Sequence, residues 1–279
     1  MVIFKMQKIA FKNNQENSKE KYKDFDFVKF EVENYNSTIG NLKYVDCPAC
    51  KNKGYIAIIE NEEVKYKACR CIKQRKISQQ LENCGINVES QKKFTFDNFY
   101  THELWQLRLK ETAIKYVNEF DKKWFCVSSI TGSGKTMLCT IIFLELLKKG
   151  YSGKYMLWKE EVPFLINNKR SFYENLQQKY EDKMNELKNV DILYVDDLLK
   201  LVNQRDLSDN LEMLYDIVNS RYIKNKVTII STELSKKEIE YLDMAIAGRI
   251  QEKCCKYWLS LINDTNRNQR IAKNALKTD

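Results

Sequence analysis

The sequence predicts an α/β fold in which helices flank a parallel sheet, with a second, smaller domain ahead of it. From residue 123 onward, apolar strand-like runs alternate with amphipathic stretches, which is typical of such a sheet. A loop with two glycines, TGSGKT at 131–136, joins the first strand to a helix. Between residues 47 and 71, four cysteines form two close pairs. We therefore expect a small domain at 1–93 and a larger one at 94–279.

The elements of the larger domain follow in order along the chain. KWFCVS (123–128) predicts a buried strand, and MLCTIIFLELLKKG (137–150) predicts a helix that ends at Gly150. Ser235 and Glu238 form a capping box for a later helix. Further strands are predicted at 153–158, within 191–200, at 226–232 and at 256–262, and amphipathic helices at 171–189 and 206–225. In the smaller domain, residues 54–68 predict a hairpin.

Composition and charge limit the class of protein. With 43% hydrophobic and 12% aromatic residues the chain reads as soluble and globular. The longest apolar run, 137–147, is too short to span a bilayer, and lysines interrupt the N-terminal apolar stretch, so we expect a cytoplasmic protein without a membrane partner. The net charge of +9 and the six positive charges of KYKACRCIKQRK (65–76) favour nucleic acid. An AT-rich genome also encodes a lysine-rich chain, and that alternative stays open.

The cysteine pairs have the spacing C-x2-C-x18-C-x-C, formed by Cys47, Cys50, Cys69 and Cys71. Two pairs that a hairpin brings together suit tetrahedral Zn²⁺, and four thiolate ligands make a closed, structural site. The alternative is four unrelated reduced cysteines. The other cysteines are expected to be small buried hydrophobes: Cys84, Cys126, Cys139, Cys254 and Cys255.

The stretch SSITGSGKTMLC (128–139) nearly matches a phosphate-binding loop, although Ser129 stands where the pattern has its first glycine. Strand, glycine loop and helix form the context that the motif needs, because backbone amides and the helix N-terminus cradle phosphates. Lys135 would reach the terminal phosphates and Thr136 would hold Mg²⁺. The alternative is a decayed remnant of the loop. The expected nucleotide ligands in this loop are Thr131, Gly132, Ser133, Gly134, Lys135 and Thr136.

A second part of the site is expected where the apolar run 192–195 ends in Asp196 and Asp197. Ligands of parallel sheets bind at this end of the strands. Asp196 would contact hydrated Mg²⁺, and Asp197 would orient or activate the attacking water.

With these pieces in order, the chain resembles the DnaC and DnaI type replicative-helicase loaders, AAA+ ATPases of bacteria and phages. The resemblance runs from Asp46 to Arg270. It rests on the cysteine module and on FTFDNF (94–99), TGSGKT, DILYVDDL, VNSRY (218–222), TIISTELS (228–235), AGRI (247–250) and DTNRNQRIAK (264–273). It implies an AAA+ sheet, ATP bound between subunits, and an N-terminal region that grips the helicase.

The resemblance also assigns roles to residues. Arg249 matches the arginine-finger position and Arg267 the second sensor arginine, while either Glu233 or Thr232 stands at the first sensor position. Asp197, where many AAA+ relatives have Glu, implies slow hydrolysis. Arginine is scarce in this chain and suits two-point contacts with phosphate, which makes four motif arginines candidates. They are Arg221, Arg249, Arg267 and Arg270.

The function that follows is ATP-driven loading of a replicative ring helicase onto single-stranded DNA, by a protein that associates with copies of itself. Its cofactors would be ATP, Mg²⁺ and Zn²⁺. Two alternatives remain: a transposase-helper ATPase, which shares the AAA+ core, and a zinc-containing adaptor that uses nucleotide only as a switch.

Overall fold

The computed structural model describes residues 26–83, 88–261 and 267–268. The chain divides into two compact units, residues 1–76 and 77–279. Among the described helices, none has both the length and the apolar character needed to cross a bilayer. The predicted boundary at 93/94, which marks the expected start of the ATPase domain, stays a prediction.

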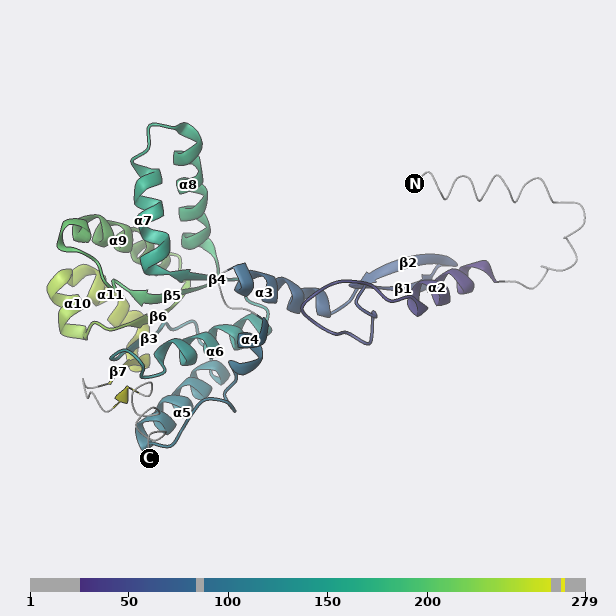
Figure 1. Ribbon diagram of the computed structural model, residues 1–279, viewed down its shortest axis with the longest axis horizontal. Helices are drawn as coiled ribbons and strands as arrows, with labels where there is room; N and C mark the ends of the chain where they lie inside the picture. Colours follow the sequence, from purple (N-terminus) through teal and green to yellow (C-terminus); the bar gives the residue numbers. More distant parts are fainter. Residues whose placement is uncertain (1–25, 84–87, 262–266, 269–279) are drawn as a thin grey trace, which may run out of the picture. The chain divides into compact units, whose positions relative to one another are not determined.

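The second unit is built on a five-stranded parallel sheet, as the sequence predicts (Figure 1). Its strands lie in the order β4-β5-β6-β3-β7. They are β3 (Phe125–Ser128), β4 (Gly153–Leu157), β5 (Ile192–Leu198), β6 (Val227–Thr232) and β7 (Trp258–Ser260). The first of them, β3, lies inside the sheet between β6 and β7. The loop that follows β3 therefore opens at the carboxyl edge where the strand order reverses, which is where such sheets bind ligands.

Helices cover both faces of this sheet (Figure 1). One face packs against α5 (Leu104–Asn118) and α6 (Lys135–Lys148), and the short α4 (Val88–Lys93) precedes them. The other face packs against α7 (Trp158–Lys169), α8 (Glu174–Asn189), α9 (Leu207–Ile223), α10 (Lys236–Leu242) and α11 (Met244–Cys254).

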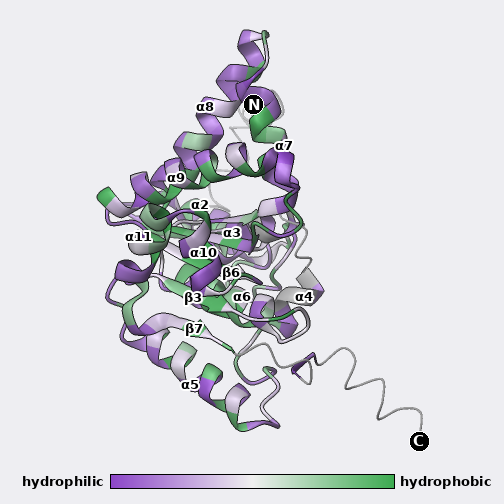
Figure 2. Cartoon of the chain, turned by 90° about the vertical axis from the view of Figure 1, so that its left-hand side faces the viewer, coloured by the Kyte–Doolittle hydropathy of each residue, from purple (hydrophilic) through white to green (hydrophobic). Residues whose placement is uncertain are grey.

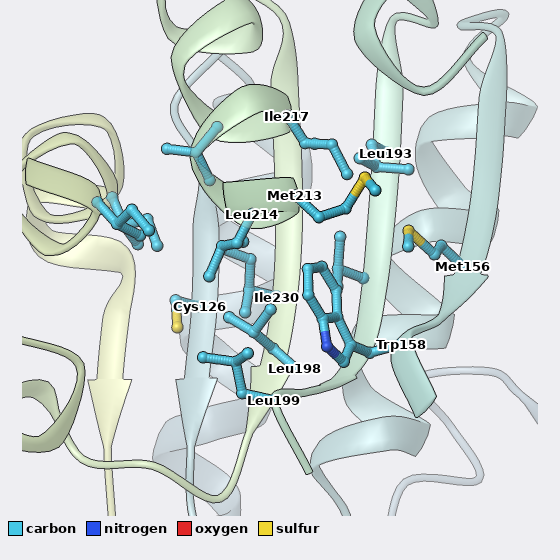
Figure 3. Packing of buried hydrophobic residues seen from close by; sticks show 14 of the residues in the cluster. Cys126, Met156, Trp158, Leu193, Leu198, Leu199, Met213, Leu214, Ile217 and Ile230 are labelled. Atoms are coloured by element: carbon cyan, nitrogen blue, oxygen red, sulfur yellow. The ribbon is translucent and has the colours of Figure 1, made fainter. Parts of the chain in front are cut away.

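Alternation along the strands divides the core between these faces. In β3, Cys126 faces the α9 side while Phe125 and Val127 face α6. Figure 3 shows the α9 side, where Met213, Leu214 and Ile217 of α9 pack on strand residues and on Trp158. Figure 2 shows hydrophobic colour in the strands and a largely hydrophilic α8. Strands buried on both faces explain why their sequences read as continuous apolar runs.

The first unit holds α2 (Phe27–Ser37) and the predicted hairpin, which is formed by the antiparallel strands β1 (Tyr55–Glu60) and β2 (Glu63–Ala68). The Asn36 side chain pairs with the edge of β1 as a neighbouring strand would. Its amide donates to the carbonyl of Ala57 (2.9 Å) and accepts from the N–H of Ala57 (3.0 Å). Lys53 donates to the carbonyls of Tyr35 and Thr38 at the end of α2. The next helix, α3 (Cys71–Asn83), begins at the fourth clustered cysteine.

Three helices of the second unit, α5, α11 and α7, were not predicted from the sequence, and Pro163 lies inside α7. Its buried Trp158, Val162 and Leu165 nevertheless have the i, i+4, i+7 spacing of a helix face. Cys126, Cys139 and Cys254 are buried as expected, whereas Cys255 is exposed, so that prediction was wrong. Cys84 and Arg270 lie outside the described residues.

Candidate functional site

The loop between β3 and α6 has the backbone of a phosphate cradle. Gly132 (φ +75°) and Gly134 (φ +86°) adopt left-handed conformations that favour glycine. Ser129 is not in that region, and its N–H donates to the carbonyl of Thr232 (3.1 Å). Ser129 therefore adopts a backbone conformation that does not require glycine, and the loop tolerates serine at this position. Within the described residues, the buried hydroxyls of Ser129 and Ser133 have no hydrogen-bond partner in the protein, so both can donate to an anion.

Lys135 and Thr136 begin α6 directly after the loop. The Lys135 side chain is almost fully buried, and its Nζ donates to the carbonyl of Ile130 at a long 3.3 Å. The hydroxyl of Thr136 donates to Oδ1 of Asp196 (3.1 Å). The structure thus brings together the residues that the sequence assigned to phosphate and to Mg²⁺, although they lie 60 positions apart.

Asp196 is buried and held by a ring of hydroxyl groups. Tyr194 donates to Oδ1 (2.8 Å), Tyr155 donates to Oδ2 (3.0 Å), and Ser231 donates to Oδ1. Burial and the nearby carboxylate raise the pKa of the Tyr194 hydroxyl well above its ordinary value, so it stays a donor. The carboxylate is therefore fixed beside Thr136. A hydroxyl and a carboxylate are oxygen donors of the kind that Mg²⁺ prefers, so these residues fit the ion.

Asp197 lies next to a chain of alternating charges. Its carboxylate pairs with Nζ of Lys200 (3.2 Å), which also pairs with Glu233 (3.0 Å). Glu233 in turn pairs with Lys135 (3.4 Å). Burial raises the pKa of Glu233, but hydrogen bonding and charge from the two lysines outweigh it and hold the pKa below its ordinary value. Nothing in the sequence marked Lys200, because its partner Glu233 lies on the segment after a different strand.

Glu233 rather than Thr232 reaches Lys135. The Thr232 hydroxyl donates to the carbonyl of Leu198 (3.0 Å) and accepts from the N–H of Leu234 (3.1 Å). Its hydrogen bonds therefore hold the ends of β5 and β6 in place.

The segment after β7 returns to the loop. The side chain of Asn268 lies against Gly132 so closely that a Cβ at Gly132 would overlap it. Its neighbour Arg267 places its guanidinium over the Trp105 ring of α5, 5.4 Å from the centroid. The structure thus brings Asn268, the residue next to Arg267, to the loop.

Arg249 lies on α11 and contacts α9 and its own helix. Its Nε donates to Asn219 (3.0 Å), and Nη1 donates to the carbonyl of Ala245 (2.8 Å). The guanidinium also lies over the rings of Tyr215 and Tyr222, at 5.2 and 5.8 Å. Within this chain, the Arg249 side chain therefore packs on α9.

Arg221 is not a phosphate ligand, so that candidate was wrong. It is fully buried in α9, and its guanidinium donates to the Thr228 hydroxyl (3.0 Å) and to four carbonyls. These belong to Leu187, Val190, Asp191 and Val227. Burial lowers the pKa of Arg221 to about 9, since desolvation disfavours the charged form. Its role is to join α8, β5 and β6.

The four predicted zinc ligands converge in the first unit. Their sulfur atoms all lie within 4.8 Å of one another. The Sγ atoms of Cys47 and Cys69 are 3.7 Å apart, and those of Cys50 and Cys71 are 3.5 Å apart. Tetrahedral Zn²⁺ with bonds of about 2.3 Å sets sulfur atoms about 3.8 Å apart, so the cluster fits this ion.

Arg75, one of the six cations of the basic run 65–76, is buried and does not contribute to a basic surface. Its buried guanidinium donates to Sγ of Cys71 (3.5 Å), to Oδ1 of Asn52 (2.7 Å) and to the carbonyl of Val45 (2.5 Å). It therefore supports the cysteine cluster instead of facing solvent. Lys65 is half-buried and pairs with Glu60 at 3.0 Å, and Lys67 pairs with the same carboxylate at 3.9 Å. Four cations of the run are exposed. They are Lys67, Arg70, Lys73 and Lys76.

Residues 90–255, more than half of the chain, match the family model described as the bacterial DnaA ATPase domain. The chain belongs to the bacterial DnaA ATPase domain family. The uncharacterized protein YqaM of Bacillus subtilis (strain 168) is 31% identical over 208 residues, which cover 71% of this chain and 64% of YqaM. The phage-like element PBSX protein XkdC of the same strain is 28% identical over 225 residues, 76% of this chain and 80% of XkdC.

A solved structure of replication initiator DnaA shares the fold. Replication initiator DnaA bound to AMPPCP and single-stranded DNA matches with a TM-score of 0.50 and 19% identity, over 67% of this chain and 55% of that one. DnaI matches with a TM-score of 0.47 and 21% identity, over 62% of this chain and 89% of DnaI. The matches thus span 64% of YqaM and little more than half of the DnaA chain. The predicted AAA+ fold is confirmed.

Proposed function

We propose that this protein is a cytoplasmic ATPase of DNA replication that loads a replicative ring helicase onto single-stranded DNA. The observation that carries the proposal is the hydrogen bond from Thr136 to Asp196, which joins the phosphate cradle to the strand that ends in Asp197. The family and the fold support nucleotide binding, since the DnaA structure that shares the fold holds the ATP analogue AMPPCP.

The chain's own residues divide the work on the nucleotide. Bound MgATP supplies the phosphoryl group that is transferred to water. Lys135 and the loop amides offset phosphate charge, and Thr136 with Asp196 hold the hydrated Mg²⁺. Asp197 orients the attacking water.

Two arginines complete the proposed site. Arg267 contributes from the segment that lies against the loop, while Arg249 acts on the nucleotide of a neighbouring copy of the chain. For that, Arg249 must leave its contacts on α9, so self-association and hydrolysis are coupled in this proposal.

DNA and helicase are assigned to different parts of the chain. The DnaA relative's structure contains single-stranded DNA, and we assign DNA binding here to the AAA+ core with help from the four exposed cations of the run 65–76. Residues 1–93 grip the helicase, and the zinc-bound cysteine cluster keeps this region folded.

The test uses the host's hexameric replicative helicase and a closed single-stranded DNA circle, onto which a ring cannot thread from an end. We expect this protein with ATP to increase the helicase retained on the circle after gel filtration, and Lys135→Ala to abolish the increase. A protein that instead retains a transposase on duplex DNA, with no effect on the helicase, would replace this proposal by the transposase-helper reading.

A further inference from the structure

A carboxylate stands beside the phosphate-binding lysine. Glu233 lies 3.4 Å from Nζ of Lys135, with about one third of its side chain exposed. Phosphate that approaches Lys135 therefore also approaches a negative charge, and like charges at such range repel strongly in a partly buried site. Some feature of the chain has to offset that repulsion if the loop is to hold ATP.

Lys200 is placed to do so. Its Nζ lies 3.0 Å from Glu233 and 3.2 Å from Asp197, and about a quarter of its side chain is exposed. Burial lowers the pKa of Lys200, but hydrogen bonds to both carboxylates outweigh this and raise it above its ordinary value. The lysine is therefore charged at neutral pH, between two acids that face the nucleotide site.

The backbone around Lys200 is shaped to hold it there. Asp197, Leu199 and Leu201 all have left-handed φ angles, between +52° and +57°, which residues other than glycine adopt at a cost. The buried side chains of Leu198 and Leu199 anchor the segment, and the N–H of Asp197 donates to Ser231 (3.0 Å). A strained segment that carries one cation between two site carboxylates indicates a functional placement.

We propose that Lys200 is the counter-charge for Glu233 and a positioning residue for Asp197. Without nucleotide, Lys200 pairs with both carboxylates, those of Glu233 and Asp197. When phosphates draw Lys135 away from Glu233, Lys200 is the only one of these two lysines that still pairs with Glu233. The ion pair between Lys200 and Asp197 then weakens. Asp197 is then free to orient water only when phosphate is present. This inference rests on the proposed function, because it assumes ATP in the loop.

Charge variants test the pairing through equilibrium binding of ATP and ADP, which does not depend on turnover. Lys200→Gln leaves Glu233 without its closer cation, so we expect ATP to bind about tenfold more weakly, the size of one partly screened charge at short range. ADP carries less charge than ATP, so the substitution should weaken ADP binding less. Glu233→Gln should bind ATP at least as well as the parent, and the double variant should return to within about threefold of it.

Two controls keep the result interpretable. Lys226→Gln removes a cation of similar exposure that pairs with Asp191 (2.9 Å) before β5 and β6 begin, at the opposite end of the same strands. It should leave ATP affinity unchanged. Lys200→Arg keeps the charge and should bind ATP nearly as the parent does, while thermal melting checks that every variant folds.

The outcomes separate this inference from the proposed function. Unchanged ATP affinity in Lys200→Gln, or a double variant as weak as Lys200→Gln alone, would overturn the role of Lys200 while ATP binding stands. If the parent fails to bind ATP, or if Lys135→Ala binds it equally well, the nucleotide site itself is wrong and the inference is overturned with it.

Discussion

Removal of zinc from the first unit should unfold that unit and leave the second unit folded. Within the described part of residues 26–76, the buried side chains are three of the cluster's cysteines, Ala57 and Arg75. Burying one alanine methyl contributes only about 1 kcal/mol, while structural zinc contributes about 10–16 kcal/mol in small zinc-finger peptides. A zinc ion held by the four cysteines would thus outweigh the apolar core of this unit. The free energy lost with it should exceed the unit's stability, which for whole proteins is typically about 5–15 kcal/mol.

The perturbation is the double substitution Cys47→Ser and Cys50→Ser, which removes one ligand from each close sulfur pair. Elemental analysis of protein purified without added metal should find one zinc per chain in the parent and none in the variant. Amide hydrogen exchange should show β1 and β2 protected only in the parent, with β5 protected in both. Cys255→Ser, which changes an exposed cysteine outside the cluster, should keep its zinc. A double variant with full zinc content or with protected hairpin amides would refute this reasoning.

Three further predictions follow from single side chains. Arg249→Ala should keep nucleotide affinity but lose turnover, and mixing it with Lys135→Ala protein should restore some activity; loss of thermal stability without recovery in mixtures would mean that its contacts on α9 are its whole role. Arg221→Met should cost about 3–5 kcal/mol in denaturant unfolding, because it leaves buried carbonyls without a donor, and a change within experimental error would contradict this. Hydrogen bonding from Ser152 lowers the pKa of Asp191 to about 2 from its ordinary 3.8, so its stabilising contribution is present above pH 4 and is lost as pH falls from about 4 to 2. Asp191→Asn should remove that part of the acid dependence in pH-dependent melting, and an unaltered acid profile would argue against it.

The sequence was sufficient to predict most of the second unit. Strands such as 125–128 and 192–198 are buried on both faces, so their apolar runs were visible without tertiary information. The strand, loop and helix around TGSGKT were also predictable, because they lie within one short segment. Three helices of this unit, α5, α7 and α11, were not predicted, and in α7 Pro163 stands between buried positions of the helix.

Residues whose partners come from distant segments could not be assigned from the sequence. Arg221 matched a family motif, but its role depends on carbonyls of α8, β5 and β6 that surround it only after folding. Arg75 appeared to be one of six surface cations, whereas the loop that buries it lies about 30 residues earlier in the chain. Lys200 and Glu233 follow different strands, and only the parallel pairing of β5 with β6 brings them together. In each case the sequence showed the charge but not what surrounds it.

In the proposed function, the loop at 129–136 binds ATP, and Asp197 orients the water that hydrolyses it. The most direct measurement compares ATP binding at equilibrium and steady-state phosphate release for the parent, Lys135→Ala and Asp197→Asn proteins, each with and without single-stranded DNA. We expect the parent to bind and hydrolyse ATP, Lys135→Ala to do neither, and Asp197→Asn to bind ATP without releasing phosphate. Phosphate release by Asp197→Asn at the parent's rate, or ATP binding by Lys135→Ala at the parent's affinity, would contradict it.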